Sequence, residues 1–227
     1  MLGPLSQTCK SDVSTINEDD ATMIHHFLPL TMVEGPGKRS CLWVQGCSIR
    51  CQGCAVPWTW DQNKGKKKEI QALFAEIEKS KREHGIEGVT FLGGEPFDQA
   101  RPLAKLAAMV KEIGLSVMTF TGYLYEDIIS SNNPHHMELL QMTDLLVDGP
   151  FIKEKLDVSR PWVGSSNQRY HFLTPRYEYL REQLLSIPNK VEVRLNIDGS
   201  VAVNGMVTLD LLKEILLEKE YKVEKKR

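Results

Sequence analysis

The 227-residue sequence lacks several features that would assign it to a specialised class of protein. Its formal net charge is only −2, so no broad excess of one sign favours nucleic acid or a membrane surface as a partner. No apolar run approaches the roughly 20 residues that span a bilayer. The polar, partly acidic N-terminus also lacks a secretory signal pattern. We therefore expect a globular protein that binds neither nucleic acid nor a membrane.

A disulfide framework is also missing. The chain has five cysteines, an odd number, and three of them lie close together, which fits a reducing compartment such as the cytoplasm. With 41% hydrophobic and 26% charged residues, the composition suits one domain with a substantial core. We expect a flexible leader over residues 1–22, a core domain over 23–175, and an extension over 176–227 that packs on the core.

What the sequence does contain is a compact group of thiols, Cys47, Cys51 and Cys54, in the pattern C-x-x-x-C-x-x-C. This spacing lets one loop direct three thiolates at one centre, as iron–sulfur clusters require. A [4Fe–4S] cluster held in this way would keep one iron open for a small molecule. Structural zinc prefers four protein ligands, usually as two separated pairs, and no second pair is present. A zinc knuckle is the alternative, and no role follows for Cys9 or Cys41.

Further motifs surround the thiols and extend their pattern: GPGKR and LWVQGC before them, P-x-TW-D after them, then GGEP at 93–96, TFTGY at 119–123 and GSSNQR at 164–169. Over roughly residues 24–175 the chain resembles the radical S-adenosylmethionine superfamily. Within that superfamily it is similar to the activating proteins of anaerobic ribonucleotide reductase. Gly53, which precedes the last cysteine, matches that branch, because many other members carry an aromatic residue there.

The resemblance implies that the three cysteines bind the cluster and that GGEP holds the amino group of S-adenosylmethionine. It places the two threonines of TFTGY near the ribose, and Asn167 and Arg169 near the carboxylate or the adenosyl part of the cofactor. Asp148 ends a buried strand, where a carboxylate commonly faces the mouth of a parallel barrel. The candidate cofactor residues are Gly93, Gly94, Glu95, Thr119, Thr121, Asp148, Asn167 and Arg169. Arg169 in a structural pair with an aspartate, and Thr119 as an ordinary buried strand residue, remain alternatives.

Strands alternating with amphipathic helices predict an α/β fold with a parallel sheet. The resemblance specifies it as an incomplete parallel (β/α) barrel, to which we add a C-terminal β-hairpin and helix. We expect strands at 23–32 (an edge strand, because of Pro29), 40–45, 88–92, 115–120 and 144–148. Helices are expected over 70–84, 103–113, 124–130, 175–186 and 208–219. Loops are expected at 62–68 and 131–136, and a hairpin at 191–205.

By resemblance, the protein is an enzyme that reductively cleaves S-adenosylmethionine to a 5′-deoxyadenosyl radical. That radical would abstract hydrogen from a glycine of a glycyl radical enzyme of the anaerobic ribonucleotide reductase type. We find no second cluster motif or flavin fingerprint, so a flavodoxin or ferredoxin is expected to donate the electron. Two alternatives stay open: a radical maturase of another protein or peptide, and a non-catalytic 4Fe–4S carrier or sensor.

Overall fold

A seven-stranded mixed sheet forms the centre of the molecule. The computed structural model describes residues 20–195, 197, 199 and 201–206. The strand order is β3-β1-β2-β4-β5-β6-β7. These strands are β1 (Ala21–Thr31), β2 (Arg39–Val44), β3 (Lys66–Glu69), β4 (Gly88–Gly93), β5 (Ser116–Phe120), β6 (Leu145–Asp148) and β7 (Arg169–Phe172). Strands β2, β4, β5 and β6 run parallel, whereas β1, β3 and β7 pair antiparallel at the two sides.

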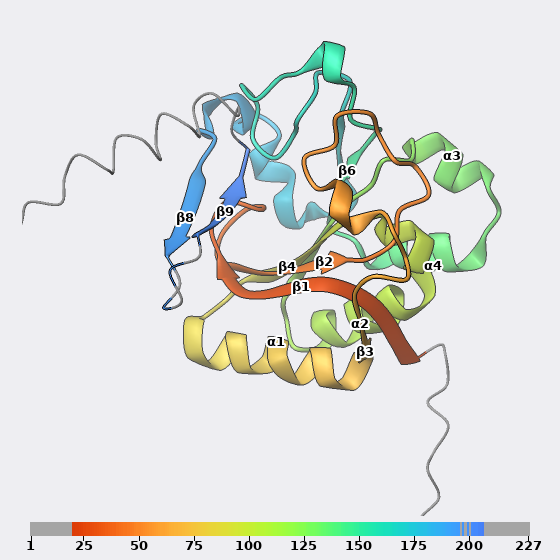
Figure 1. Ribbon diagram of the computed structural model, residues 1–227, viewed down its shortest axis with the longest axis vertical. Coiled ribbons are helices and arrows are strands. Elements are labelled where there is room, and N and C mark those ends of the chain that lie inside the picture. The colour runs from red at the N-terminus through yellow and green to blue at the C-terminus, as the bar shows by residue number, and fades with distance from the viewer. Residues whose placement is uncertain (1–19, 196, 198, 200, 207–227) are drawn as a thin grey trace, which may run out of the picture.

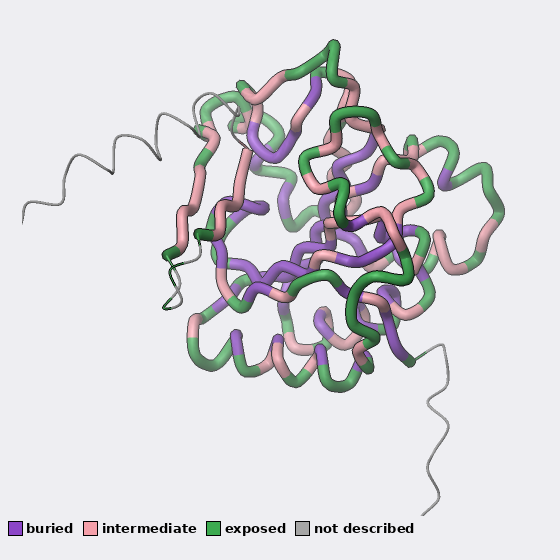
Figure 2. Tube along the Cα trace, in the orientation of Figure 1, coloured by how far each residue is buried: buried purple, intermediate pink, exposed green. Residues whose placement is uncertain are grey.

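Helices cover one face of this sheet, as Figure 1 shows for α1 and α2 below the strands. The helices are α1 (Ile70–His84), α2 (Ala100–Glu112), α3 (Tyr125–Ser130) and α4 (Pro134–Met142). Alternate strand residues such as Leu42, Val44 and Phe91 pack against helix residues such as Leu73 and Leu103, all of them buried. This layer is the main core, visible as the buried centre in Figure 2. Its burial supplies the hydrophobic stabilisation that isolated helices of this length lack.

The opposite face is covered by the C-terminal part of the chain. Trp162, Tyr177 and Leu180 form a second buried cluster with Met118 and Leu145 of the sheet. Beyond them, β8 (Val191–Leu195) and β9 (Val201–Gly205) form the expected antiparallel hairpin. The side chain of Glu192 accepts hydrogen bonds from Thr31 Oγ1 at 2.7 Å and from the Met32 amide at 3.0 Å. The hairpin is therefore fastened to the end of β1.

The prediction that residues 23–32 form an edge strand is wrong only for the start of β1, because β1 pairs with β2 along one side and with the short β3 on the other. Residues 66–68 of the predicted loop, together with Glu69, form β3 instead. However, β3 reaches only Ala21–Ile24 of β1. Pro29 lies beyond that reach, at an irregularity in the β1–β2 register between Leu28 and Thr31. Its missing N–H therefore removes no hydrogen bond to β3.

Two further expectations needed correction. The predicted loop at 131–136 contains the start of α4, whose first residue is Pro134. Its cap, Asn133, accepts a hydrogen bond from the His135 amide at 3.0 Å. Proline at the first helical position after an asparagine cap is a recognised start signal. Residues 175–186 form two short 3₁₀ helices, η5 (Pro175–Leu180) and η6 (Leu184–Ser186), rather than one helix.

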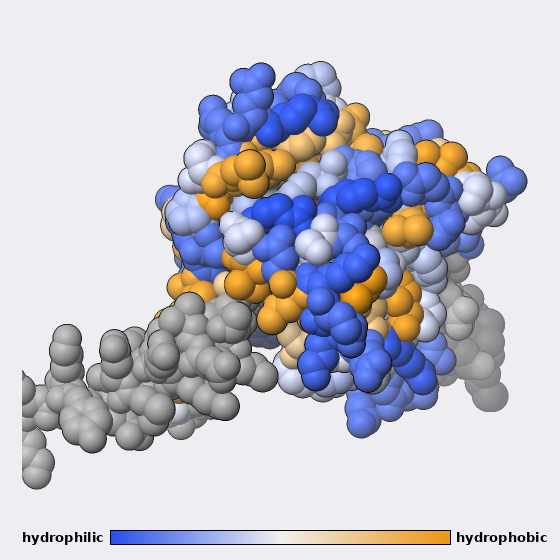
Figure 3. Space-filling model, turned by 90° about the horizontal axis from the view of Figure 1, so that it is seen from above, coloured by the Kyte–Doolittle hydropathy of each residue, from blue (hydrophilic) through white to orange (hydrophobic). Residues whose placement is uncertain are grey.

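The predicted α/β class with a parallel central sheet is confirmed. The described strands form an open sheet with antiparallel strands at both sides, so the partial barrel stays a prediction. The helix predicted over 208–219 and most of the leader lie outside the described residues. Seen from the side of the loop that follows β6, apolar surface patches are small and separated by polar surface (Figure 3). Within the described part of the chain, no helix has the length and apolar character that crossing a membrane requires.

Candidate functional site

The three clustered cysteines lie in the loop that follows β2, beside the glycine pair that follows β4. The parallel register aligns Val44 with Gly93. Just beyond it, the Gly94 amide donates to the Val44 carbonyl at 2.9 Å, and the Glu95 amide donates to the Gly46 carbonyl at 2.8 Å. A Cβ at Gly94 would lie only 2.1 Å from the Gly46 oxygen. The glycine pair thus lets the two loops touch, because any larger residue would push them apart.

The cysteine loop closes on its own starting point. The amides of Gly46 and Cys47 donate to the carbonyls of Thr59 and Trp60 at 2.8 and 3.1 Å. The side-chain amide of Gln45 donates to the carbonyls of Trp58 and Asp61 at 3.0 and 2.7 Å. The cysteines therefore occupy a closed loop whose two ends are held by backbone hydrogen bonds.

Cys47, Cys51 and Cys54 are free thiols of intermediate exposure, whereas Cys41 is fully buried within β2. Burial raises the pKa of Cys47 and of Cys51. Backbone N–H groups nevertheless point at the sulfurs: the Arg50 amide at Cys47 Sγ (3.5 Å) and the Val56 amide at Cys54 Sγ (3.4 Å). At Cys47 this hydrogen bond acts against the effect of burial on the pKa and so favours the thiolate form that metals require.

In the described residues, no three histidine, cysteine or acidic side chains converge as ligands of a single metal ion. A cubane cluster does not need such convergence, because each thiolate binds a different iron atom. The arrangement of the three thiols is therefore compatible with a cluster.

Glu95, the acidic residue of GGEP, is buried and joins the loop after β4 to the loop after β5. Its Oε1 accepts hydrogen bonds from the Phe97 amide (2.9 Å) and from Thr121 Oγ1 (2.8 Å), and its Oε2 accepts one from the Gly122 amide (2.8 Å). Burial outweighs these three donors and raises the pKa of Glu95 to about 7. Because a carboxylate has about four lone-pair sites, Oε2 retains room for one more donor.

A cavity of about 540 Å³ lies between the cysteine loop and the loops after β5 and β6. Its volume is within the range of pockets for cofactors and drug-sized molecules, roughly 300–1,000 Å³. Asn167 lines it and donates to the Pro150 carbonyl at 2.8 Å, while its own Oδ1 is buried with no hydrogen-bond partner in the structure. The lining residues are Ile49, Gly122, Tyr123, Leu124, Asp127, Pro150, Ile152 and Asn167.

These features fit the cofactors that the sequence predicted. A buried amide oxygen without a partner is uncommon in folded proteins and indicates a polar ligand or a water molecule. Gly122, which lines the cavity, lies close to the Glu95 carboxylate: a Cβ at Gly122 would be 3.7 Å from Glu95 Oε2. The cavity thus offers an acceptor from Asn167, a nearby carboxylate and apolar walls, next to the loop that carries the three thiols.

Asp148 and Arg169 contact each other. The Arg169 guanidinium donates to both carboxylate oxygens of Asp148 and pairs with Glu126, with one N–O distance of 2.7 Å. Asp148 also accepts from the Tyr125 amide at 2.7 Å and lies 3.1 Å from His171 Nε2. Burial acts to raise the pKa of Asp148, but the nearby His171 and the hydrogen bonds from Arg169 and the Tyr125 amide prevail and hold that pKa well below its usual range. The structural Arg–Asp pair considered from the sequence is therefore present.

The two candidate threonines occupy different surroundings. Thr121 bonds to Glu95 beside the cavity, as described above. Thr119 is fully buried, and its hydroxyl lies 2.9 Å from that of Thr143, which in turn donates to the Leu139 carbonyl of α4. Thr119 thus faces the helical layer rather than the cavity.

Sequence reasoning missed the apolar cavity wall. Ile49, Leu124, Pro150 and Ile152 each neighbour a motif, but none has a chemical signature of its own. Only their position in the loops after adjacent parallel strands could have identified them, since such loops meet at one end of a sheet.

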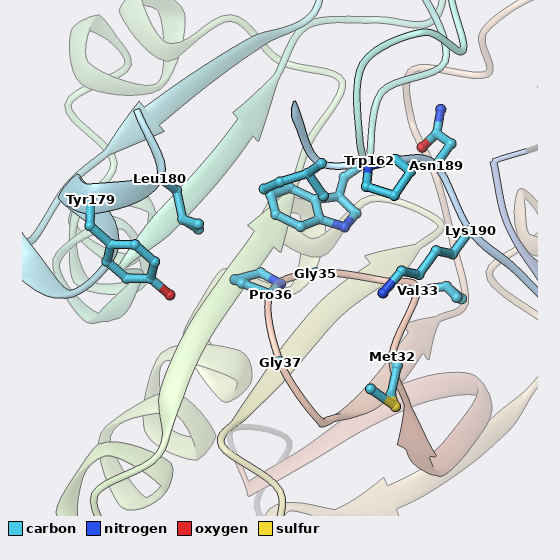
Figure 4. Close-up of a pocket in the computed structure, with 12 residues that line it drawn as sticks. Met32, Val33, Gly35, Pro36, Gly37, Trp162, Tyr179, Leu180, Asn189 and Lys190 are labelled. Carbon is cyan, nitrogen blue, oxygen red and sulfur yellow. The ribbon is translucent and has the colours of Figure 1, made fainter. Parts of the chain in front are cut away.

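A second, smaller cavity of about 180 Å³ lies at the other end of the sheet, between the β1–β2 connection and the C-terminal segment (Figure 4). Its wall holds no cysteine, histidine or acidic residue, and we assign it no chemistry. The wall consists of Met32, Val33, Gly35, Pro36, Gly37, Trp162, Tyr179, Leu180, Ile187, Pro188, Asn189 and Lys190.

The chain is similar to a known family and to several curated proteins. Residues 33–171 match the family described as a 4Fe-4S single cluster domain, which favours a cluster over zinc. The anaerobic ribonucleoside-triphosphate reductase-activating protein of Salmonella typhi is 31% identical over 156 residues, covering 66% of this chain and 97% of that protein. Its counterpart in Escherichia coli K12 is 31% identical over 155 residues, with the same two shares. The phage T4 counterpart is 33% identical over 148 residues, covering 62% and 88%.

Among solved structures, QueE from Escherichia coli superposes on 45% of this chain and 52% of its own, with a TM-score of 0.39 and 18% identity. That likeness is too distant to bear on the fold or the function. The family match and the curated relatives are sufficient to assign the family. The three free thiols lie in a loop beside a cofactor-sized cavity. This chain belongs to the 4Fe-4S single cluster domain family and, within it, to the anaerobic ribonucleoside-triphosphate reductase-activating proteins.

Proposed function

We propose that this protein activates a glycyl radical enzyme of the anaerobic ribonucleotide reductase type by removing a hydrogen atom from one of its glycines. The observation that carries the proposal is the cavity beside the loop of the three thiols, lined by Gly122, whose amide bonds to Glu95, and by Asn167 with its unpartnered oxygen. The relatives at 31% identity are named for activating such a reductase.

In the proposed site, Cys47, Cys51 and Cys54 hold the [4Fe–4S] cluster. Glu95 accepts a hydrogen bond from the cofactor's ammonium group, and Asn167 accepts one from a donor elsewhere on the cofactor. When bound, the cluster and S-adenosylmethionine together supply one-electron cleavage of the sulfonium and, from it, hydrogen-atom abstraction. The chain's own residues hold these groups side by side and exclude water with apolar walls such as Ile49 and Ile152.

The remaining candidate residues act indirectly in this proposal. Gly93 and Gly94 allow the two loops to touch. Thr121 orients Glu95 through its 2.8 Å hydrogen bond. Asp148 and Arg169 form a pair that holds the start of α3, since Tyr125 and Glu126 bond to the same pair. We assign no cofactor contact to Thr119, because its hydroxyl is engaged with Thr143.

The electron and the protein partner come from outside the chain in this proposal. After Cys47, Cys51 and Cys54 are assigned, only Cys9 and Cys41 remain of the five cysteines, too few for a second cluster. We infer a flavodoxin or ferredoxin donor and the cytoplasm as location, where reducing conditions keep thiols free.

The test is anaerobic reconstitution with iron and sulfide, followed by dithionite, S-adenosylmethionine and an anaerobic ribonucleotide reductase. We expect 5′-deoxyadenosine by chromatography and a glycyl radical signal by electron paramagnetic resonance (EPR) on the reductase. The matched control is reductase whose radical-bearing glycine is replaced by alanine. Failure to cleave the cofactor, with the cluster intact and reduced, would refute the proposal.

One observation favours a different protein substrate. The family match ends at residue 171, whereas the chain continues through η5, η6 and the β8–β9 hairpin, which bonds to Thr31 and Met32. Added structure of this kind is where a different partner would be recognised. Cofactor cleavage without a glycyl radical on any reductase tested would therefore favour a radical maturase of another protein or peptide.

A further inference from the structure

Three cofactor-site loops meet at Asp98, which lies three residues after Glu95 in the 3₁₀ helix η3 (Pro96–Gln99). Its Oδ2 accepts the Ser48 amide at 2.7 Å. Its Oδ1 accepts the Ser48 hydroxyl and the Tyr123 hydroxyl, each at 2.9 Å. The two hydroxyls are themselves 2.8 Å apart, which closes a triangle of polar groups. This triangle joins the loops that follow β2, β4 and β5.

The two residues that bond to Asp98 lie next to the cluster ligands and in the cavity wall. Ser48 stands between the cluster ligand Cys47 and the cavity residue Ile49 in the sequence. Tyr123 lines the same cavity. Because Asp98 binds both the amide and the hydroxyl of Ser48, it restricts the backbone between the cluster ligand Cys47 and the cavity residue Ile49. Hydrogen bonds to a charged carboxylate are shorter and stronger than neutral ones, which suits this restraint.

An ordinary helix-capping role does not explain these contacts. The start of η3 is already capped by Glu95, which accepts the Phe97 amide at 2.9 Å. The hydrogen bonds given above come to Asp98 from two other loops, not from its own helix. Asp98 also does not line the cavity, so it does not serve as a wall for the cofactor.

We propose that Asp98 is a positioning residue that fixes Cys47, Ile49 and Tyr123 in the geometry that S-adenosylmethionine binding requires. This inference rests on the proposed function. Glu95 joins the loops after β4 and β5 in the buried layer, and Asp98 adds the cysteine loop to them at the surface. Without Asp98, the cluster still forms on its three thiolates. The cysteine loop that carries the cluster is then no longer held in a fixed position relative to the cavity.

The test compares D98N, D98A and S48A with the wild type after anaerobic reconstitution. Iron content, the affinity for S-adenosylmethionine and the EPR spectrum of the reduced cluster with and without that cofactor are measured. We expect D98A to keep its iron, to lose about tenfold or more in affinity, and to show an altered cofactor-induced EPR change, as loss of charge-assisted hydrogen bonds predicts. D98N keeps the shape and one acceptor, so it should recover part of the affinity. S48A, which keeps the amide contact, should fall between D98A and the wild type.

The matched control is D144N. Asp144 also bonds to several partners, Lys111 Nζ at 2.8 Å, the Val117 amide at 2.8 Å and Thr174 Oγ1 at 2.7 Å, but it precedes β6 at the opposite end of the sheet. We expect D144N to lower the unfolding temperature while leaving the cofactor-induced EPR change as in the wild type.

The inference is overturned if D98A and S48A bind S-adenosylmethionine and change the EPR spectrum as the wild type does. If D98A fails to fold, D98N and S48A decide in the same way. The outcome is separate from that of the proposed function: affinity and EPR changes are measurable even if no glycyl radical forms. Conversely, a glycyl radical formed by the wild type supports the proposed function only, and the affinities and EPR spectra of the variants decide the role of Asp98.

Discussion

Glu95 and Glu34 are two buried glutamates at opposite ends of one sheet, and their surroundings differ. Burial raises the pKa of both to about 7. Glu95 follows β4 and accepts three hydrogen bonds, two from amides and one from Thr121. Glu34 precedes β2, and in the described part of the chain its carboxylate accepts the Gly205 amide at 2.9 Å while Glu192 adds repulsion. Glu95 thus has a raised pKa although several donors surround it, whereas Glu34 has a raised pKa with few donors around it.

This difference separates the two ends of the molecule. At the cofactor end, meaning the loops after β2, β4, β5 and β6, carboxylates are surrounded by donors and the loops are tied to each other. At the hairpin end, meaning the starts of those strands with β8 and β9, Glu34 has fewer donors, and the side chain of Glu192 from the hairpin faces it. We infer that the hydrogen bonds of Glu95 serve to join two loops at the cofactor end, whereas Glu34 joins the sheet to the hairpin.

The largest expected effect is at the cofactor end. Cys51→Ala removes one of three ligands and should abolish the cluster absorption of reconstituted protein, because two thiolates do not secure a cubane. Cys41→Ala is the control, since that thiol is fully buried in β2. The measurement is the visible spectrum together with iron content. A four-iron cluster in Cys51→Ala would remove its assignment as a ligand.

Gly94→Ala should break the contact between the cysteine loop and the glycine loop. The new Cβ would lie 2.1 Å from the Gly46 carbonyl oxygen, so one loop must move. We expect a loss of roughly 3 kcal/mol in the free energy of unfolding, as for overpacked sites, measured by urea denaturation of the metal-free protein. Gly85→Ala, at φ 64° with open space around it, should cost only roughly 1 kcal/mol. Equal losses in the two variants would contradict the close loop contact.

Glu34→Gln tests the hairpin end through pH. The folded pKa of Glu34 is raised above its unfolded value, so its favourable contribution is complete below the unfolded pKa. That contribution declines as pH rises toward the folded pKa of about 7. The neutral glutamine removes this decline and should stabilise the protein relative to wild type at pH 8 by roughly 2 kcal/mol. Among the described residues, the groups facing Glu34 include the Gly205 amide, Glu192, Arg194 and the Cys41 thiol. A constant difference between pH 4 and pH 8 would refute the assignment.

Glu95→Gln is the corresponding substitution at the cofactor end. It keeps the shape of the buried group but removes the charge that would meet a cofactor ammonium. The affinity for S-adenosylmethionine should fall about tenfold, or ~1.4 kcal/mol, while the cluster still forms. Equilibrium dialysis of the reconstituted protein measures this. Unchanged affinity would show that Glu95 only joins the two loops.

The motifs and the main elements were predictable because the residues themselves carry the signal. Apolar residues at helical spacing predict α1 and α2, and alternating apolar and polar residues on both sides of the sequence pair Asp198-Gly199 predict the hairpin. The short strand β3 was not predictable, because three successive lysines suit a loop equally well in isolation. Only its pairing with Ala21–Ile24 makes residues 66–69 a strand.

Within the site, the limits have a specific physical cause. The strand at 115–120 is apolar on both faces, so the sequence does not reveal which alternate residues face the helices, and Thr119 was grouped with Thr121. The contact between Asp148 and Arg169 depends on β6 and β7 pairing antiparallel, with these two residues opposite each other. Asp98 and Ser48 were missed because single polar residues next to a motif carry no pattern of their own.

The edges of the sheet bear on how a protein partner can approach. On one side β3 presents exposed Lys66 and Lys67, and the part of β1 beyond it carries Pro29. On the other side β7 begins with the exposed Arg169. Charged, short or proline-containing edges resist the addition of a foreign strand. A partner's glycine-bearing segment should therefore enter over the loops at the cofactor end and not by extending the sheet.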